Sequence, residues 1–130
     1  ATVEQETGFI EALTGHPQNF MIVAMLSGEL VGGCSVMAVS GHIKTRHRGS
    51  LGISVEQKAW GGLGTAMIEA ALRQAKENGF AQVELGVFED NSRARHLYEK
   101  LGFQEQGRTL RAFRLKDGTY RDEIQMVKFL

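Results

Sequence analysis

One local pattern constrains the fold of this chain more than any other. Residues 50–55 have strand character, residues 61–64 are rich in glycine, a helical repeat covers residues 62–77, and residues 80–87 alternate as another strand. Two strands joined through a helix run parallel in one sheet, with a right-handed crossover. The sequence therefore predicts an α/β fold that contains a parallel strand pair.

The flanking segments predict antiparallel pairs and two more helices. Four segments are expected to form two hairpins: residues 20–25 with 30–39, and residues 104–115 with 120–129 around Asp117-Gly118. Gly32-Gly33 predicts a bulge or a close neighbour inside the second of these strands. Residues 2–13 are predicted as a helix, as are residues 93–101, which Asn91 or Ser92 would cap and Gly102 would end. The result is an α+β mixed sheet, mostly antiparallel, in a single domain over residues 1–130.

Composition excludes several classes of protein. Fifteen Lys and Arg balance fifteen Asp and Glu, which argues against a broadly cationic nucleic-acid binder. The single cysteine, Cys34, excludes an internal disulfide and a multi-cysteine metal site, and it is expected to be a small buried apolar residue. No apolar run is long enough for a membrane span, and the first residues lack the features of a secretory signal. We expect a cytoplasmic protein without a metal, a nucleic-acid partner or a membrane partner.

The glycine-rich stretch is the first candidate binding site. A strand that runs into glycines at a helix start directs unpaired backbone N–H groups and the positive end of the helix dipole at one point, which favours phosphate. The residues concerned are Gly61, Gly62, Leu63, Gly64 and Thr65. A purely structural alternative is a tight turn with close helix packing. The spacing fits neither a Walker loop nor the dinucleotide fingerprint.

A second motif makes the functional interpretation more specific. From residue 91 the chain reads Asn-x-x-Ala-x-x-Leu-Tyr-Glu-Lys-Leu-Gly-Phe, ending at Phe103. With the preceding strand and glycine-opened helix, this resembles the GNAT superfamily of N-acetyltransferases, over roughly residue 20 to the end of the chain. Within the superfamily the chain looks most like bacterial enzymes that modify ribosomal-protein termini, polyamines or small amines.

The resemblance implies a GNAT-like fold that holds acetyl-CoA as cosubstrate, in a wedge between two splayed parallel strands. It implies that the backbones of Ile53 and Val55 pair with the pantetheine arm and that the amides of residues 61–65 hold the pyrophosphate. Asn91 would reach the pantetheine. Tyr98 would act as the general acid that protonates the departing CoA thiolate, since a phenol with a pKa of about 10 keeps its proton at neutral pH.

The spacing of these two side chains agrees with the resemblance. Asn91 and Tyr98 are two helical turns apart and share a face. The alternatives are a plain helix cap for Asn91 and a half-buried structural tyrosine for Tyr98.

An amine acceptor must lose a proton before it attacks, so a general base is expected. Glu84 is one candidate, with a solvated strand face as the simpler explanation, and His47 is another, with a basic edge loop as the alternative. Four arginines near the last hairpin could meet an acidic acceptor or the 3′-phosphate of CoA, or could be solvated: Arg108, Arg111, Arg114 and Arg121.

The family pattern sets an expectation for the start of the chain, and the residues themselves set one for its end. GNAT domains usually begin with a strand and a helix ahead of residues 2–13, and we expect the domain to lack both. The apolar residues 126–130 could pair at a sheet edge in a homodimer. The predicted function is acetyl transfer to a primary amine, on a small molecule, a protein N-terminus or a lysine, by direct attack in a ternary complex. The alternative is a non-catalytic acyl-CoA-binding sensor on the same fold.

Overall fold

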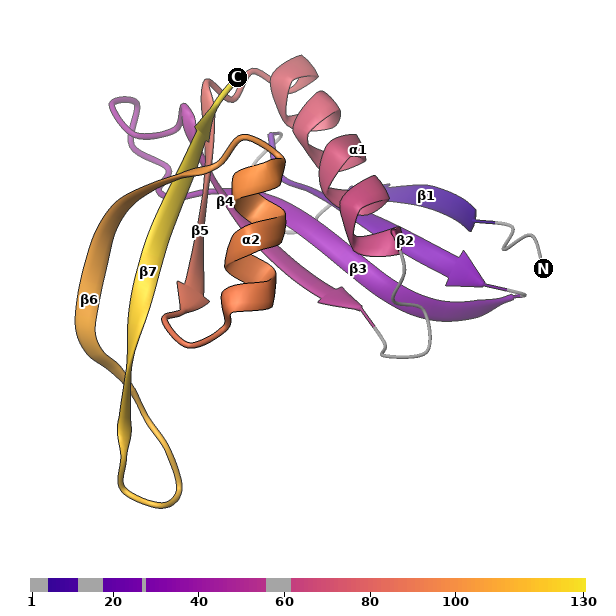
Figure 1. Ribbon diagram of the computed structural model, residues 1–130. Helices are drawn as coiled ribbons and strands as arrows, with labels where there is room; N and C mark the ends of the chain where they lie inside the picture. The colour runs from indigo at the N-terminus through magenta and orange to yellow at the C-terminus, as the bar shows by residue number, and fades with distance from the viewer. Residues whose placement is uncertain (1–4, 12–17, 27, 56–61) are drawn as a thin grey trace. The chain divides into compact units, whose positions relative to one another are not determined.

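The computed structural model describes residues 5–11, 18–26, 28–55 and 62–130. The elements along the chain are β1 (Gln5–Glu11), β2 (Phe20–Leu26), β3 (Glu29–Ala38), β4 (Arg48–Val55), α1 (Leu63–Glu77), β5 (Gln82–Phe88), α2 (Ser92–Lys100), β6 (Gln104–Arg114) and β7 (Tyr120–Phe129) (Figure 1). They belong to two compact units. Residues 1–83 with Leu130 form the first, and residues 84–129 form the second.

The first unit contains four strands in the order β1-β2-β3-β4, and each neighbouring pair is antiparallel. The predicted hairpin of β2 and β3 is confirmed, with Gly28 at φ 81° in its turn. The predicted bulge is confirmed as well: Leu30 pairs with Met25 and Gly32 with Ala24, so Val31 is the extra residue. Val31 is buried there.

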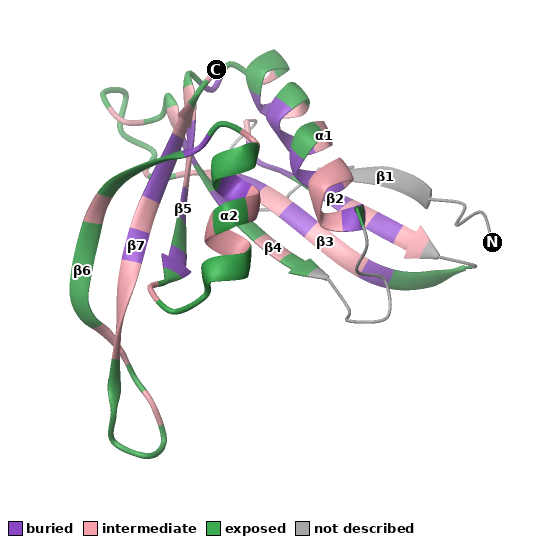
Figure 2. Ribbon diagram, in the orientation of Figure 1, coloured by how far each residue is buried: buried purple, intermediate pink, exposed green. Residues whose placement is uncertain are grey.

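Helix α1 packs on this unit's strands β2, β3 and β4. Its buried residues recur at helical spacing and form one face: Leu63, Met67, Ile68, Ala71, Leu72 and Ala75 (Figure 2). Gly62 caps its start at φ 87°, and Asn78 and Gly79 end it, the glycine at φ 91°. The helix predicted over residues 62–77 is therefore confirmed, together with its stop signal.

The helix predicted over residues 2–13 is wrong. Residues 5–11 form β1, which pairs with β2 along its whole length, from Gln5 opposite Leu26 to Glu11 opposite Phe20. β2 already pairs with β3 on its other edge, so its remaining N–H and C=O groups need partners. Thr7 and Gly8 are also poor helix formers. The tertiary pairing outweighs the short apolar repeat that favoured a helix.

The second unit combines most of β5 with α2, β6 and β7, and its strand order is β5-β7-β6. Asn91 caps α2, and Gly102 follows the helix at φ 98°, as predicted. The hairpin of β6 and β7 turns at Gly118, where φ is 87°. β6 is mostly exposed, whereas β7 carries buried residues (Figure 2). The C-terminal strand thus lies between β5 and β6, and β6 ends the order. The expected pairing of the C-terminal segment at a sheet edge is therefore wrong, because both edges of β7 are already paired within the chain.

Within the described residues, no helix combines the length and apolar character that a membrane crossing would require.

Candidate active site

No side chain of the described residues caps the start of α1. Gly62 takes the left-handed conformation and offers no side-chain cap to the helix. A Cβ on Gly62 or on Gly64 would meet no atom of the described residues within 4 Å. The first N–H groups of a helix have no acceptor within the helix itself, and they lie at its positive end. This end of α1 therefore has the geometry of an anion-binding site.

The other residues of the predicted phosphate site differ in their surroundings. Leu63 is buried and belongs to the core face of α1, so that only its backbone N–H can serve a ligand. Thr65 is half-buried in the first turn. Gly61 lies outside the described residues. Of the described residues in the predicted phosphate site, Leu63 thus has a side chain that belongs to the core, whereas Thr65 keeps part of its surface accessible.

Ile53 and Val55 end strand β4, which leads toward α1. Ile53 is half-buried and lies opposite Cys34 of β3, and Val55 lies opposite Gly32. Because they are two residues apart in a strand, their backbone N–H and C=O groups point to the same edge. A pantetheine arm that follows this edge could pair with both residues, and that contact stays a prediction.

Asn91 acts as the cap of α2. Its side-chain Oδ1 accepts a hydrogen bond from the backbone N–H of Ala94, at 3.2 Å, and the residue is exposed. The capping role proposed from the sequence is confirmed. The amide nitrogen of the same side chain has no hydrogen-bond partner among the described residues, and its contact with pantetheine stays a prediction.

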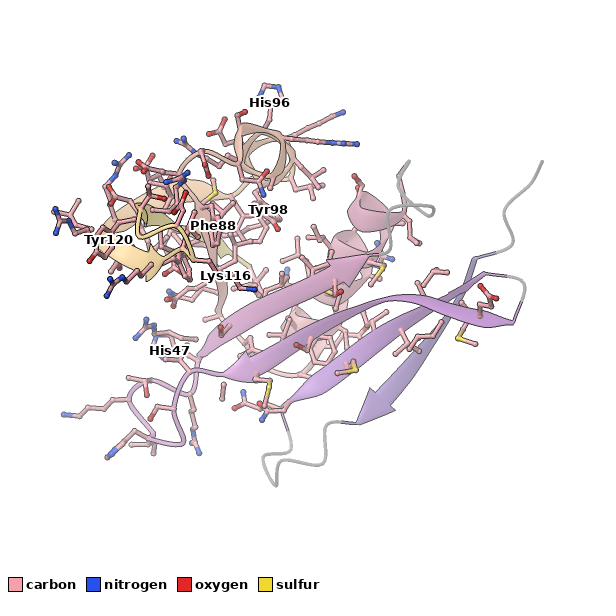
Figure 3. The ribbon with its side chains drawn as sticks, turned by 90° about the horizontal axis from the view of Figure 1, so that it is seen from below. His47, Phe88, His96, Tyr98, Lys116 and Tyr120 are labelled. Atoms are coloured by element: carbon pink, nitrogen blue, oxygen red, sulfur yellow. The ribbon has the colours of Figure 1, made fainter. Side chains whose placement is uncertain are left out.

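Tyr98 is the buried residue of α2. Its side chain packs edge-on against the ring of Phe103, with centroids 5.9 Å apart and an interplanar angle of 62°. The N–H of Phe103 donates to the carbonyl of Tyr98 at 2.9 Å, which fixes the chain as it leaves the helix. Tyr98 and the exposed His96 leave α2 on different sides (Figure 3). A rigid ring of this kind can hold its hydroxyl at a fixed position.

Glu84 lies on β5, on the face opposite to the buried Val83 and Leu85. Its Oε1 accepts a hydrogen bond from Nε2 of Gln106 at 3.3 Å. Sequence analysis missed Gln106, because only the strand register brings residues 84 and 106 together.

A second carboxylate lies on the same face of this unit. Glu123 covers Gly86, and its Oε1 accepts a hydrogen bond from Nε2 of Gln125 at 2.7 Å. Nε2 of Gln125 also donates to the hydroxyl of Thr109 at 2.8 Å. The face that carries Glu84 is therefore polar and hydrogen-bonded rather than an unstructured solvated surface.

Two other reactive side chains have simpler surroundings. His47 is exposed ahead of β4, and its carbonyl accepts the N–H of Ala81 at 2.9 Å. Cys34 is buried in β3, and desolvation raises the pKa of its thiol to about 12, so it stays protonated and unreactive. The prediction of a buried apolar cysteine is confirmed. In the part of the chain that the structure describes, no three His, Cys, Asp or Glu side chains gather as metal ligands would.

Residues 2–103 match the acetyltransferase (GNAT) family. The chain belongs to the GNAT family. A curated relative, the L-amino acid N-acetyltransferase AaaT of Escherichia coli K12, is 30% identical over 123 residues, which cover 91% of this chain and 73% of the relative. This GNAT chain is thus an acetyl-CoA-dependent N-acetyltransferase by class.

Solved structures agree with the family. A GNAT acetyltransferase from Streptococcus pneumoniae superposes with a TM-score of 0.84 at 29% identity, covering 89% of this chain and 70% of that one. The protein yncA of Salmonella typhimurium, solved with its cofactor acetyl-CoA, shares the fold with a TM-score of 0.79 at 20% identity, over 86% of this chain and 65% of that chain. The predicted α/β, GNAT-like fold class is confirmed.

Proposed function

We propose that this chain transfers the acetyl group of acetyl-CoA to a primary amine, by direct attack in a ternary complex. The observation that carries the proposal is the uncapped start of α1, where Gly62 leaves the first-turn amides without a side-chain cap. Those amides suit a pyrophosphate. Family membership supports acetyl-CoA as the donor, and a structure of the same fold was solved with it.

The reaction needs two proton transfers. The amine nitrogen attacks the thioester carbonyl carbon, a C–N bond forms, and the C–S bond breaks to release a thiolate. A general acid gives the thiolate a proton, and a general base removes the extra proton from the amine. Holding both substrates in one orientation lowers the barrier further.

We assign the acid role to Tyr98. Burial and the edge contact with Phe103 restrict the ring, so that its hydroxyl is presented at a defined place. A phenol carries a proton at neutral pH and can donate it to a thiolate, whose conjugate acid has a pKa in the same range.

We assign the base role to Glu84. The hydrogen bond from Gln106 orients its carboxylate, and a neutral amide donor leaves the negative charge in place. A carboxylate has two oxygens, and either can accept the proton of the amine directly or through a water molecule beside it.

The acceptor that we favour carries an α-amino group. The curated relative is named for L-amino acids as acceptors. A protein N-terminus presents the same group, and a lysine side chain is the remaining primary amine of this class.

The test is CoA release from acetyl-CoA across a panel of free amino acids, N-terminal peptides, polyamines and lysine peptides. Released CoA can be followed with a thiol reagent, because the chain's one cysteine is buried. Faster release with one amine class, with the acetylated product confirmed by mass spectrometry, is expected. Tight acetyl-CoA binding without release by any amine would instead identify a non-catalytic sensor.

A further inference from the structure

The hairpin of β6 and β7 contains a bulge of unusual size. Thr109 pairs with Glu123 and Phe113 with Arg121, so three residues of β6 face the single Asp122 of β7. Arg111 in this bulge has φ 51°, and it is the one non-glycine residue with positive φ among those described. A long side chain adopts that backbone at an energetic cost, and such strain gathers at functional positions.

The bulge is held in place by Asp122. Its Oδ1 accepts the backbone N–H of Arg111 at 2.9 Å, and its Oδ2 accepts Nη1 of Arg108 at 3.0 Å. Arg108 also pairs with Glu89 at 3.3 Å. The strained backbone at Arg111 is thus fixed by a carboxylate rather than being a loose loop.

The four arginines of the hairpin fall into two classes. Arg108 pairs with Asp122 and Glu89, and Arg121 pairs with Asp90 at 2.9 Å. Arg111 and Arg114 make no ion pair with any residue that the structure describes. Their guanidinium carbons instead lie 4.7 Å and 5.9 Å from the centre of the Tyr120 ring. We call Arg111, Arg114 and Tyr120 the arginine platform.

The arginine platform lies in a cationic and exposed part of the hairpin. Residues 110–120 hold three cations, Arg111, Arg114 and Lys116, against one carboxylate, Asp117. That carboxylate is engaged locally, since its Oδ1 accepts the hydroxyl of Thr119 at 2.6 Å and the Thr119 N–H at 2.9 Å. Figure 3 shows Tyr120 among side chains that end in nitrogen atoms. Leu110, at the bulge, is 71% exposed.

We propose that the arginine platform binds an acidic polypeptide segment, with carboxylates on the guanidinium groups of Arg111 and Arg114 and an apolar side chain against Leu110. A guanidinium offers its donors in a planar fork that matches a carboxylate in two parallel hydrogen bonds. Stacking on Tyr120 orders both side chains before the partner arrives, so less conformational entropy is lost on binding.

The surroundings favour a polypeptide over a nucleic acid. Glu89, Asp90 and Asp122 pair with Arg108 and Arg121, so of the four arginines only Arg111 and Arg114 are left to bind an anion in the described hairpin. Two neighbouring guanidinium groups suit a pair of carboxylates, whereas a nucleic-acid backbone needs cations spaced along its row of phosphates. Arginine and tyrosine are enriched at protein interfaces, and the exposed Leu110 adds apolar surface beside them.

The experiment is fluorescence anisotropy of a short labelled peptide of glutamates with one central leucine, titrated with the full chain at low and at moderate salt. Arg114→Gln and Arg111→Asn remove the two guanidinium groups, and asparagine tolerates positive φ. Each substitution is expected to raise Kd by roughly tenfold, as loss of a charge-assisted hydrogen bond does. Arg73→Gln removes one exposed arginine from α1 and should leave Kd unchanged.

Three results would overturn the proposal. The first is the absence of peptide binding at low salt. The second is an equal loss from Arg73→Gln and Arg114→Gln, because net charge alone would then explain the binding. The third is tighter binding of a single-stranded RNA of the same charge, or displacement of the peptide by saturating CoA, either of which would assign the platform to phosphate.

One variant separates geometry from charge. Arg114→Lys keeps the positive charge but loses the planar fork and the stacked contact with Tyr120. A Kd between those of the wild type and Arg114→Gln is expected, and full retention of affinity would contradict the role of the guanidinium. The readout is binding alone, so it stands or falls independently of acetyl transfer.

Discussion

Cγ1 of Val36 lies over Gly49, 2.6 Å from the position that a Cβ on residue 49 would occupy. A ring carbon of Phe80 lies 3.2 Å from the same point, and both neighbours are buried. Valine is stiff at χ1 and cannot turn away within a packed core. Gly49→Ala is therefore expected to lower the free energy of unfolding by about 1–3 kcal/mol, measured by urea denaturation.

The matched control is Gly41→Ala. A Cβ there would meet nothing within 4 Å, and the residue is exposed in the turn after β3. Its free energy of unfolding should change by less than about 0.5 kcal/mol, as for most surface substitutions. Equal effects at residues 41 and 49 would contradict the close packing of Val36 on β4.

Cys34 should make the stability of the protein fall at alkaline pH. Burial raises the pKa of its thiol from 9.0 to about 12, so between these values the unfolded chain releases a proton that the folded chain keeps. Unfolding then becomes easier as pH rises, by up to about 1.4 kcal/mol per pH unit. The contribution of the protonated thiol to the free energy of unfolding is fully present below pH 9 and is lost as the pH rises to about 12.

The measurement compares the pH dependence of unfolding for the wild type and Cys34→Ala. The variant is expected to be less stable at neutral pH but to lose less stability between pH 9 and about pH 11, since it has no thiol to titrate. Identical slopes would show that other groups account for the alkaline loss.

Local signals predicted the second unit's helix and turns because each depends on neighbours in sequence. Asn91 caps the nearby amide of Ala94, and Gly102 supplies the positive φ that ends α2. The helix predicted over residues 2–13 failed for the opposite reason. Strand β1 depends on its pairing with β2, and a short apolar repeat does not report that pairing.

The candidate site divides in the same way. The spacing of Asn91 and Tyr98 within one helix can be read from sequence, and so can the glycines before α1. The contact of Glu84 with Gln106 joins residues 22 positions apart and depends on the exact strand register. No local sequence signal indicates the positive φ of Arg111, because this conformation results from the uneven pairing of β6 with β7.

Asn91 has a structural role and a proposed binding role, and two substitutions separate them. Asn91→Ala removes the cap of α2 and should lower the free energy of unfolding by about 1 kcal/mol. Asn91→Asp keeps an acceptor for the N–H of Ala94 and should restore stability. If the side-chain amide also binds pantetheine, the KM for acetyl-CoA should stay raised in Asn91→Asp. Recovery of both quantities would leave Asn91 as a cap alone.

Glu84→Gln keeps the shape of the side chain and a partner for Gln106 but removes the proton acceptor. If Glu84 is the general base, this substitution should lower kcat/KM by about 10²-fold or more, measured with the best amine at saturating acetyl-CoA. The control is Glu99→Gln, an exposed carboxylate on α2 that should leave kcat/KM unchanged. A Glu84→Gln enzyme with wild-type activity would point to another base, with His47 the next residue to test.

Tyr98→Phe removes one hydroxyl and keeps the ring that packs against Phe103. Because the acid acts only as the C–S bond breaks, kcat should fall by about 10²-fold while the affinity for acetyl-CoA stays near that of the wild type. Calorimetric titration with acetyl-CoA and steady-state CoA release measure the two quantities separately. A variant that binds more weakly but turns over normally once saturated would show that the hydroxyl holds the cofactor and does not protonate the thiolate.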